Sequence, residues 1–342
     1  MRPILSKPKG YEFYTKILGS PKYIVGPMVE QSELAWRMLC RRYNAHLCYT
    51  PMFHAKLFSD PIGGPKYRLD QWSIHPEDRP LIVQFCANDP DILTRAAKMV
   101  EHDCEAVDLN LGCPQHIAKK GRYGSFLQDD WELIYKLIST LDRELMVPVT
   151  AKIRVFESVS KTVDYAHMLV EAGAQLITVH GRRREQKGHH TGLADWTKIK
   201  AVKDAVNIPV IANGNILYHD DLQTCFEQTG VDGVMSAEGV LYNPTLFQPG
   251  QIMPPKAYDV ALEYLEICKQ LDPITRPPVI KSHLFKLFHQ AFRVHTDLRS
   301  QLGTSNTLEA MEHITLTLRE RLLKEDVAIS LCQPYIRPNL PR

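Results

Sequence analysis

Hydrophobic and polar positions change their spacing repeatedly along the first 250 residues. Short apolar runs rich in Val and Ile are separated by longer amphipathic segments, which is typical of parallel strands buried on both faces. The pattern predicts eight strands, at residues 23–29, 46–50, 81–86, 105–110, 147–155, 176–181, 208–214 and 233–238. It predicts helices between them, at residues 33–43, 90–102, 131–144, 162–172, 196–205 and 220–229.

Eight strand–helix units within about 250 residues match the size of a TIM (β/α)8 barrel, which is an α/β fold. The alternative is an open, doubly wound sheet. No GxGxxG segment follows the first predicted strand, which counts against that alternative. We therefore predict a catalytic barrel domain over residues 1–250.

A different pattern begins after the Pro-Gly pair at 249–250. The strand-like runs stop, and amphipathic segments predict helices at residues 257–270, 280–295 and 307–324. Residues 251–342 are accordingly predicted to form a small all-helical domain that ends in an extended tail at 333–342.

Composition narrows the class of protein. Of the 342 residues, 44% are hydrophobic and 23% are charged, which excludes a disordered or collagen-like chain. No apolar run approaches the roughly 18 residues of a membrane-spanning helix, and the N-terminus lacks the apolar segment of a secretory signal. We expect a soluble monomer that binds no membrane. We place it in the cytoplasm, with the nucleus also open because no targeting motif is legible.

Cysteine spacing and charge limit the kinds of site that the chain can carry. The eight cysteines form no CxxC pair and no zinc-like pattern, so we predict reduced thiols and no metal site. The formal net charge is only +2, so a nucleic-acid site must be a local basic patch. The densest basic segment is 182–190. A polar stripe on the predicted helix 280–295 is either an RNA contact or a solvated helix face: Ser282, Lys286, His289 and Arg293.

Polar residues recur where the predicted strands end, which is the active-site face of a TIM barrel. Each residue alone has a simpler explanation. Lys152 is either a Schiff-base lysine or a charge paired with a carboxylate, and His180 could be a satisfied core histidine. Seven strand ends with polar or special residues together favour a site: Pro27 to Val29, Gln84, Asn110 to Pro114, Lys152 with Arg154, His180 to Arg182, Asn213 to Asn215, and Ala237 to Gly239.

The Asn213-Gly214-Asn215 turn follows the seventh predicted strand, where such barrels commonly bind phosphate. Its glycine permits close approach, and its backbone amides can donate hydrogen bonds. We infer a phosphate-bearing cofactor, with Lys152 as a cation beside a reactive ring such as a flavin. Cys113 lies in a Gly-Cys-Pro segment followed by several basic residues, which leaves a catalytic thiol and a structural thiol equally open.

Six segments in chain order resemble the tRNA-dihydrouridine synthase family: NLGCP at 110–114, GRYGSFL at 121–127, KIRV at 152–155, VHGR at 179–182, PVIANGNI at 209–216 and GVMSAEGVLYNPTLF at 233–247. HLFKLFH at 283–289 extends the resemblance into the predicted helical domain. The SAEG segment and VQFCANDP at 83–90 resemble the eukaryotic branch that acts at positions 16 and 17 of the tRNA D-loop.

The resemblance implies an enzyme that binds FMN, takes electrons from NADPH and reduces uridine in tRNA to 5,6-dihydrouridine. Cys113 matches the family's catalytic cysteine, which donates the proton to C5 of uracil. The residues that match its FMN site are Pro27, Met28, Val29, Gln84, Lys152, His180, Asn213, Gly214, Asn215, Ala237 and Glu238. Given this resemblance, we expect six further residues to contact tRNA: Asn110, Arg154, Arg182, Arg183, Lys286 and Arg293.

One position departs from the family pattern. Many members carry Gly-Arg where this chain has Ala237-Glu238, and a glutamate cannot face a phosphate as an arginine does. We therefore expect backbone amides to bind the phosphate and the Glu238 side chain to point elsewhere.

Two alternative functions remain. One is an FMN oxidoreductase that acts on a free small pyrimidine, which the helical domain and the basic loop disfavour. The other is a tRNA-binding protein without chemistry, which the presence of Cys113, Lys152 and His180 disfavours.

Overall fold

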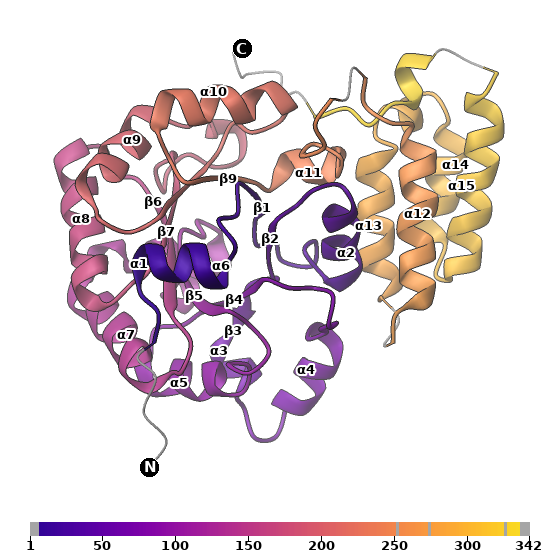
Figure 1. Cartoon of the computed structure of the whole chain (residues 1–342). Helices are drawn as coiled ribbons and strands as arrows, with labels where there is room; N and C mark the ends of the chain where they lie inside the picture. The colour runs from indigo at the N-terminus through magenta and orange to yellow at the C-terminus, as the bar shows by residue number, and fades with distance from the viewer. Residues whose placement is uncertain (1–6, 251–252, 273–274, 325–326, 336–342) are drawn as a thin grey trace.

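Eight parallel strands close into a barrel in the computed structural model, which describes residues 7–250, 253–272, 275–324 and 327–335 (Figure 1). The sheet closes because β2 pairs with β4 as well as with β1. The strands of the closed barrel are β1 (Tyr23–Val25), β2 (Leu47–Tyr49), β4 (Leu81–Cys86), β5 (Ala106–Leu111), β6 (Val149–Arg154), β7 (Ile177–His180), β8 (Val210–Asn213) and β9 (Gly233–Ser236). The predicted TIM barrel is confirmed. The sequence did not predict β3 (Phe53–His54), which pairs only with β4.

Helices surround the barrel between successive strands (Figure 1). They are α2 (Leu34–Arg42), α3 (Ala55–Phe58), α4 (Gly64–Gln71), α5 (Pro90–Lys98), α6 (His116–Gly121), α7 (Trp131–Glu144), α8 (Val159–Ala172), α9 (Trp196–Ala205), α10 (His219–Thr229) and α11 (Glu238–Tyr242). Four of them begin after a side chain that accepts a hydrogen bond from a first-turn amide: Asp89, Asp130, Ser158 and Asp195. Such caps satisfy amides that have no partner within the helix. Helices α5, α7 and α9 therefore start where the sequence predicts, whereas α8 starts three residues before its predicted start, directly after Ser158.

The first predicted strand is shorter than expected. It ends at Val25, and Pro27, Met28 and Val29 lie in the loop that follows. Pro27 has no N–H to contribute to a sheet. The loop instead folds back on itself, because the amide of Met28 donates to Ser32 Oγ over 3.0 Å.

The N-terminal segment closes one end of the barrel. Phe13, Tyr14 and Leu18 are buried with the inward-facing residues of the strands, such as Ile82 and Met235. This segment comprises α1 (Gly10–Glu12) and the π-helical turn Phe13–Ile17, and α1 crosses the barrel end that faces the viewer in Figure 1. The amino ends of the strands are therefore sealed with apolar side chains, so a ligand can enter only from the opposite end.

The inward-facing side chains become polar toward the carboxyl ends of the strands. Because side chains alternate along a strand, every second residue faces the barrel interior. In β5 these positions are Ala106, Asp108 and Asn110, and in β4 they begin with Ile82 and continue with Gln84. The intervening residues, such as Val107 and Leu109, pack outward against the helices. The barrel thus presents a polar face at one end only.

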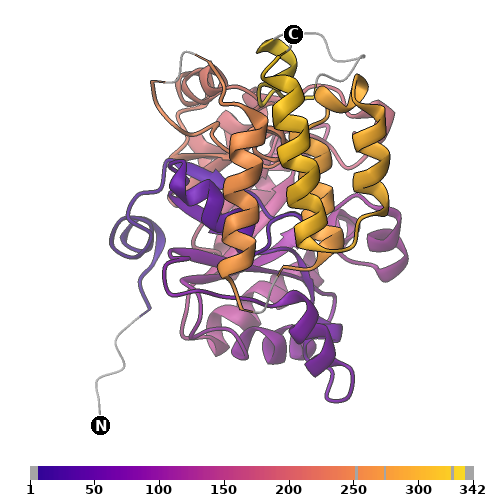
Figure 2. The ribbon, with the colours of Figure 1, turned by 90° about the vertical axis from the view of Figure 1, so that its right-hand side faces the viewer.

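The helical region consists of α12 (Ala257–Gln270), α13 (Pro277–Leu287), α14 (Thr296–Thr304) and α15 (Leu308–Leu322), which stand side by side against the barrel (Figure 2). The sequence predicted α12 and α15 closely but did not predict α14. The predicted domain boundary adjoins residues 251–252, and the predicted tail extends into 336–342. Both of these segments lie outside the described residues.

The prediction of one continuous helix over residues 280–295 is wrong. The helix ends at Leu287, and a separate 3-10 turn spans Ala291–Arg293. The carbonyl of Lys286 explains the break, because it accepts from the amide of His289 and from its ring nitrogen Nδ1, over 3.3 and 3.0 Å. That carbonyl would otherwise accept the amide four residues later and continue the helix. Lys286 and Arg293 therefore lie on different elements.

A buried polar cluster joins the barrel to the helical region. Glu33, which precedes α2, accepts hydrogen bonds from the Tyr264 hydroxyl of α12 and from His283 Nε2 of α13, over 2.7 and 2.9 Å. The His283 ring stacks on Trp36 with 3.9 Å between ring centroids. Burial alone would raise the pKa of the Glu33 carboxyl. The charge of His283 and the hydrogen bonds from His283 and Tyr264 lower it by more, so the pKa of Glu33 lies below its ordinary value. This carboxylate is an ionic anchor between the two parts of the chain.

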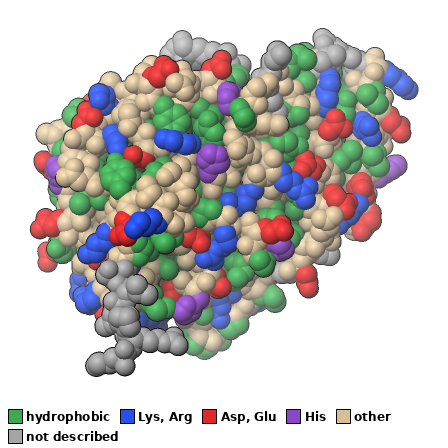
Figure 3. Space-filling model, viewed as in Figure 1, with side chains coloured by type: hydrophobic (Ala, Val, Ile, Leu, Met, Phe, Trp, Pro, Cys, Tyr) green, Lys and Arg blue, Asp and Glu red, His purple; other side chains and the backbone are tan. Residues whose placement is uncertain are grey.

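Surface charges of both signs are interspersed on the face shown in Figure 3, in keeping with the small net charge. Among the described residues, no helix combines the length and the apolar character needed to cross a membrane. The same part of the chain contains no cluster of three or more His, Cys, Asp or Glu that could hold a metal ion.

We predict that Glu33→Gln lowers the free energy of unfolding by about 3 kcal/mol, because His283 then loses its charged partner in a buried site. Urea unfolding measures this change. Glu30→Gln is the matched control, since the Glu30–Arg276 pair lies at the same junction but is largely exposed. That control is expected to cost less than about 1 kcal/mol. Equal effects of the two substitutions would contradict the role of Glu33 as an anchor.

Candidate active site

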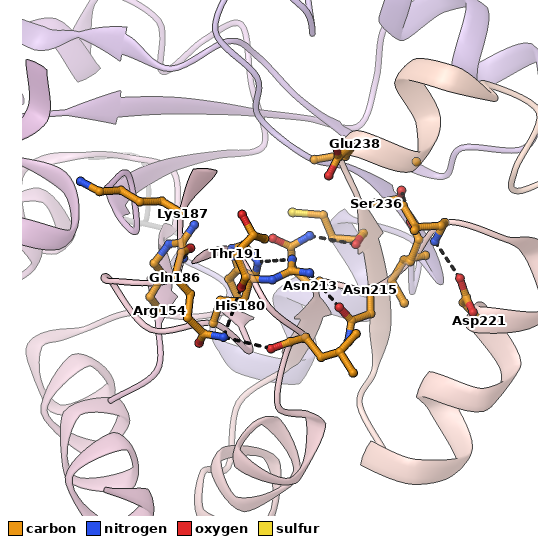
Figure 4. Close-up of a pocket in the computed structure, with 18 of the residues that line it drawn as sticks. Arg154, His180, Gln186, Lys187, Thr191, Asn213, Asn215, Asp221, Ser236 and Glu238 are labelled. Carbon is orange, nitrogen blue, oxygen red and sulfur yellow. Dashed lines mark hydrogen bonds between the residues drawn. The ribbon is translucent and has the colours of Figure 1, made fainter. Parts of the chain in front are cut away.

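A cavity of about 910 Å³ opens at the carboxyl ends of the strands (Figure 4). It contains eight of the residues predicted to bind cofactor or substrate: Arg154, His180, Arg182, Asn213, Gly214, Asn215, Ala237 and Glu238. The other predicted residues do not line it: Pro27, Met28, Val29, Gln84, Asn110, Cys113, Lys152, Arg183, Lys286 and Arg293. Pro114 does line it, so the cavity reaches the loop that carries Cys113.

His180 is held as a neutral imidazole with a defined proton. Arg182 Nη1 lies 3.1 Å from His180 Nε2, and a guanidinium can only donate, so Nε2 accepts. Burial, together with the nearby charges of Lys152, Arg154 and Arg182, keeps the pKa of His180 well below its ordinary value. The proton of the neutral ring must then be on Nδ1. Among the described residues, that N–H has no acceptor, so it is available to a ligand.

The turn after β8 exposes several backbone amides. Gly214 and Asn215 both have left-handed φ angles, of 110° and 64°. Within the described ranges, the amides of Gly214, Asn215 and Ile216 donate to no protein acceptor. A Cβ on Gly214 would lie 2.7 Å from Ala194 Cβ and 2.9 Å from His180 Cδ2, so only glycine fits here. The amides and the close packing suit an anionic group such as a phosphate.

Side chains also fix this turn from two directions. The Asn213 amide donates to the carbonyl of Met235 over 3.0 Å, and Asn215 Oδ1 accepts from Arg182 Nη2 over 2.8 Å. Asn215 Oδ1 also accepts the amide of Ala194 over 3.0 Å. The turn is therefore rigid before any ligand binds, which reduces the entropy lost on binding.

Glu238 lines the cavity, although the sequence led us to expect its side chain to point elsewhere. Its charge also acts on Lys286 of α13. Burial lowers the pKa of the Lys286 ammonium, and the negative charge of Glu238 opposes that shift. The charges of Glu238 and Lys286 thus attract each other across the junction of the barrel and the helical region.

A chain of buried hydrogen bonds crosses the polar end of the barrel. The Thr150 hydroxyl donates to Asp108 Oδ1 over 2.6 Å, and the Gln84 amide donates to Asp108 Oδ2 over 2.8 Å. The Asn110 amide donates to Gln84 Oε1 over 2.8 Å. Asn110 Oδ1 in turn accepts the amide of Cys113 over 2.9 Å. This chain fixes which atom of each side-chain amide is the donor, and it holds the Cys113 loop in place.

Asp108 starts that chain, and the sequence analysis did not select it. It lies two residues before Asn110 in β5, at an inward-facing position of an otherwise apolar strand. Because every second residue of a strand faces the same side, the spacing between Asp108 and Asn110 is the sequence signal that could have identified Asp108. Burial raises the pKa of Asp108 to about 6, although hydrogen bonds and Lys152 act in the opposite direction.

Lys152 lies beside this chain, because it pairs with Asn110 across β5 and β6. Burial and the charge of Arg154 lower its pKa to about 8, which Asp108 and Cys113 partly oppose. Among the described residues, Lys152 Nζ has no hydrogen-bond partner. The ammonium is therefore free to interact with a ligand at the end of the barrel.

Cys113 differs from the other seven cysteines, because it is half-buried and they are buried. It contacts a small cluster formed by Cys86, Ala118 and Tyr123. The segment around Cys113 is closely packed. A Cβ on Gly124 would lie 2.7 Å from the Cys113 carbonyl oxygen, and that carbonyl also accepts the amide of Ser125.

The arginines of the site make structural contacts. Arg154 donates to the carbonyls of Gly112, Arg183 and Gln186, so it ties the Cys113 loop to the basic loop. Arg183 forms an ion pair with Glu157. Arg184 pairs with Asp129 over 2.6 Å. These two charges of the basic loop are therefore paired with carboxylates at the protein surface.

Comparison with known proteins identifies the family. The family model described as dihydrouridine synthase matches residues 23–330. The chain belongs to the dihydrouridine synthase family. The match spans the barrel and α12 to α15, so the resemblance inferred from the six sequence segments is confirmed, and so is the prediction that the chain is an oxidoreductase enzyme.

Curated members of this family are similar over nearly the whole chain. The chain is 48% identical to a "tRNA-dihydrouridine(16/17) synthase [NAD(P)(+)]-like" protein of Rattus norvegicus, over 98% of this chain and 78% of the rat protein. It is 48% identical to the "tRNA-dihydrouridine(16/17) synthase [NAD(P)(+)]" of Saccharomyces cerevisiae, over 98% of this chain and 88% of the yeast protein.

A human "tRNA-dihydrouridine(20a/20b) synthase [NAD(P)+]-like" protein is more distant, at 37% identity over 70% of this chain and 76% of the human protein. Among solved structures, a 2-naphthoyl-CoA reductase complex aligns with a TM-score of 0.51 and 10% identity, over 66% of this chain and 49% of that one. That likeness concerns the fold alone.

We predict that the stability of this dihydrouridine synthase depends on pH through Asp108. Because its pKa rises from 3.8 to about 6 on folding, the folded state binds this proton more readily, and stability falls as pH rises through that interval. Between pH 4.5 and 7 the loss is about 2 kcal/mol, and Asp108→Asn removes it because asparagine does not titrate.

Urea unfolding at the two pH values measures this difference. Asp91→Asn, on the exposed surface of α5, is the matched control and is expected to follow the unmodified protein. An unchanged pH dependence in Asp108→Asn would show that Asp108 does not carry the effect.

Proposed function

We propose that this protein reduces uridine to 5,6-dihydrouridine in the D-loop of tRNA, at positions 16 and 17, with FMN as cofactor and NADPH as reductant. The observation that carries the proposal is the 48% identity over 98% of the chain to proteins named for that activity. The helical region, which the family match includes, favours a tRNA substrate over a free pyrimidine.

The residues at the end of the barrel fit FMN. The free amides of the Gly214 to Ile216 turn and the close packing around Gly214 suit its phosphate. The cavity of about 910 Å³ is within the usual range for small-molecule sites. FMN, when bound and reduced by NADPH, would supply the hydride that adds to the C5=C6 bond of uracil. His180 would contact the ring system from the cavity lining, through its Nδ1–H. Gln84 and Lys152 would contact it from the polar end of the barrel, outside that lining.

Lys152 supplies positive charge at that position. Its pKa of about 8 leaves the ammonium mostly protonated at neutral pH. A fixed cation stabilises negative charge that develops on a neighbouring group, and it does so most strongly where water is excluded. The rigid strand β6 holds Lys152, so no reorganisation is needed.

Cys113 Sγ is the proton donor in this proposal. Uracil gains a hydride at C6 and a proton at C5, so a general acid is required on the face of the ring opposite the hydride donor. The hydrogen bond from the Cys113 amide to Asn110 Oδ1 holds the thiol in a defined position. Asn110 is positioned in turn by Gln84, which the proposal places against FMN.

The visible absorption spectrum of the purified protein tests the cofactor. We expect a flavin spectrum that bleaches when NADPH is added without oxygen, and dihydrouridine at positions 16 and 17 of a tRNA substrate, located by mass spectrometry. A colourless protein that fails to take up FMN would overturn the proposal. Turnover of free pyrimidines without tRNA would favour the small-molecule alternative.

We predict that Cys113→Ala slows dihydrouridine formation at least 100-fold while bound flavin and its reduction by NADPH remain, because only the proton donor is lost. Cys86→Ala is the matched control, since Cys86 lies in the same side-chain cluster. The control is expected to retain activity. Loss of flavin from Cys113→Ala would instead indicate a structural thiol.

A further inference from the structure

A second cavity, of about 700 Å³, lies where the barrel meets the helical region. Its walls come from α11, from α13 and the turn after it, from α14 and from the last described residues. The lining residues that matter here are Tyr242, His289, Phe285, Arg293, Arg299 and Tyr335. Helices α11 and α13 are in contact, and Figure 1 shows them at this junction.

Aromatic rings make up much of the lining of this cavity. Tyr242 and Tyr335 stack with 6.0 Å between ring centroids and 23° between planes. His289 stands edge-on to Tyr242, with 4.9 Å between centroids. Tyr335 is 43% exposed, which is high for a large aromatic side chain in a cavity wall. Flat aromatic surface of this kind stacks readily on a nucleobase.

The lining of the cavity is also basic. Arg293 and Arg299 line it, and no acidic side chain does. Within the described residues, neither guanidinium has a carboxylate partner. They differ in this from Arg183 and Arg184 of the basic loop, which are both paired. Two unpaired guanidiniums beside aromatic rings are complementary to a base with its phosphate.

The second cavity adjoins the active-site cavity. Tyr335 lines both of them. Helix α11 links them as well, because Glu238 at its start lines the first cavity and Tyr242 at its end lines the second. Tyr335 and α11 therefore contribute to the walls of both cavities, so a ligand in the first cavity lies next to the second.

We propose that the second cavity binds an unstacked nucleotide of the same tRNA, near the target uridine in the chain. The base lies against Tyr242 and Tyr335, and the phosphates contact Arg293 and Arg299. This inference rests on the proposed function. A target base must leave its stack to react, which also unstacks its neighbours in a single-stranded loop. Capture of one of those neighbours would hold the loop in the reactive conformation.

Equilibrium binding of an in vitro transcribed tRNA to the full chain, measured over a range of salt concentrations, tests the proposal. We expect Tyr335→Leu, which keeps apolar bulk but removes the ring, to weaken binding about tenfold with an unchanged salt dependence. Arg299→Gln is expected to weaken binding and to reduce the slope of log Kd against log salt by about 0.7 to 1.

Arg95→Gln is the matched control, because it removes one exposed arginine from α5, a barrel helix that lies apart from the helical region (Figure 1). Neither the affinity nor the salt slope should change in it. Unchanged tRNA affinity in both Tyr335→Leu and Arg299→Gln, with normal unfolding curves, would overturn the proposal and leave the cavity to a ligand other than RNA.

Abasic transcripts identify the captured nucleotide. Single abasic sites are placed at each D-loop position beside the target uridine. One of these abasic sites is expected to weaken tRNA binding to the unmodified protein about tenfold. The same abasic site should not weaken binding to the Tyr335→Leu variant any further, because both changes remove the same contact. Additive losses at every position would refute the stacking contact. Flavin bleaching of the unmodified protein, measured without tRNA, tests the proposed function separately.

Discussion

The alternation of side chains along the parallel strands is the constraint on which the rest of this structure depends. Every second residue must face the barrel interior, so each strand contributes both to an inner and to an outer layer. At the amino ends the inner layer is apolar, and Phe13, Tyr14 and Leu18 seal it. At the carboxyl ends the inner layer is polar. The same geometry therefore gives the barrel a closed base and a reactive end.

Buried polar groups at that end are stable only because they satisfy one another. Asp108, Gln84 and Asn110 form a continuous chain in which each amide donates to the next acceptor. Removing one member would leave others unpaired in a low-dielectric site, which is costly. The chain ends at the amide of Cys113, so the barrel core directly determines where the proposed proton donor lies.

The helical region is attached to the barrel through polar contacts as well as apolar packing. Glu33 bridges α12 and α13, and the charge of Glu238 in the cavity wall attracts Lys286 of α13. Of the elements joined in this way, α11 and α13 also line the second cavity. The position of the helices is thus determined by the barrel, and a tRNA bound across the junction would contact both parts at once.

The sequence alone determined the barrel, its eight main strands, the family resemblance and the identity of the residues at the strand ends, because these depend on period, composition and local motifs. It did not reveal Asp108, whose role depends on an inward orientation and on partners from β4 and β6. It also could not show that Arg154 and Arg183 make structural contacts, or that the helix predicted over 280–295 ends at Leu287, where the Lys286 carbonyl is already occupied. Those outcomes depend on contacts between residues far apart in the chain, or on competition for a single acceptor, and only the tertiary structure decides them.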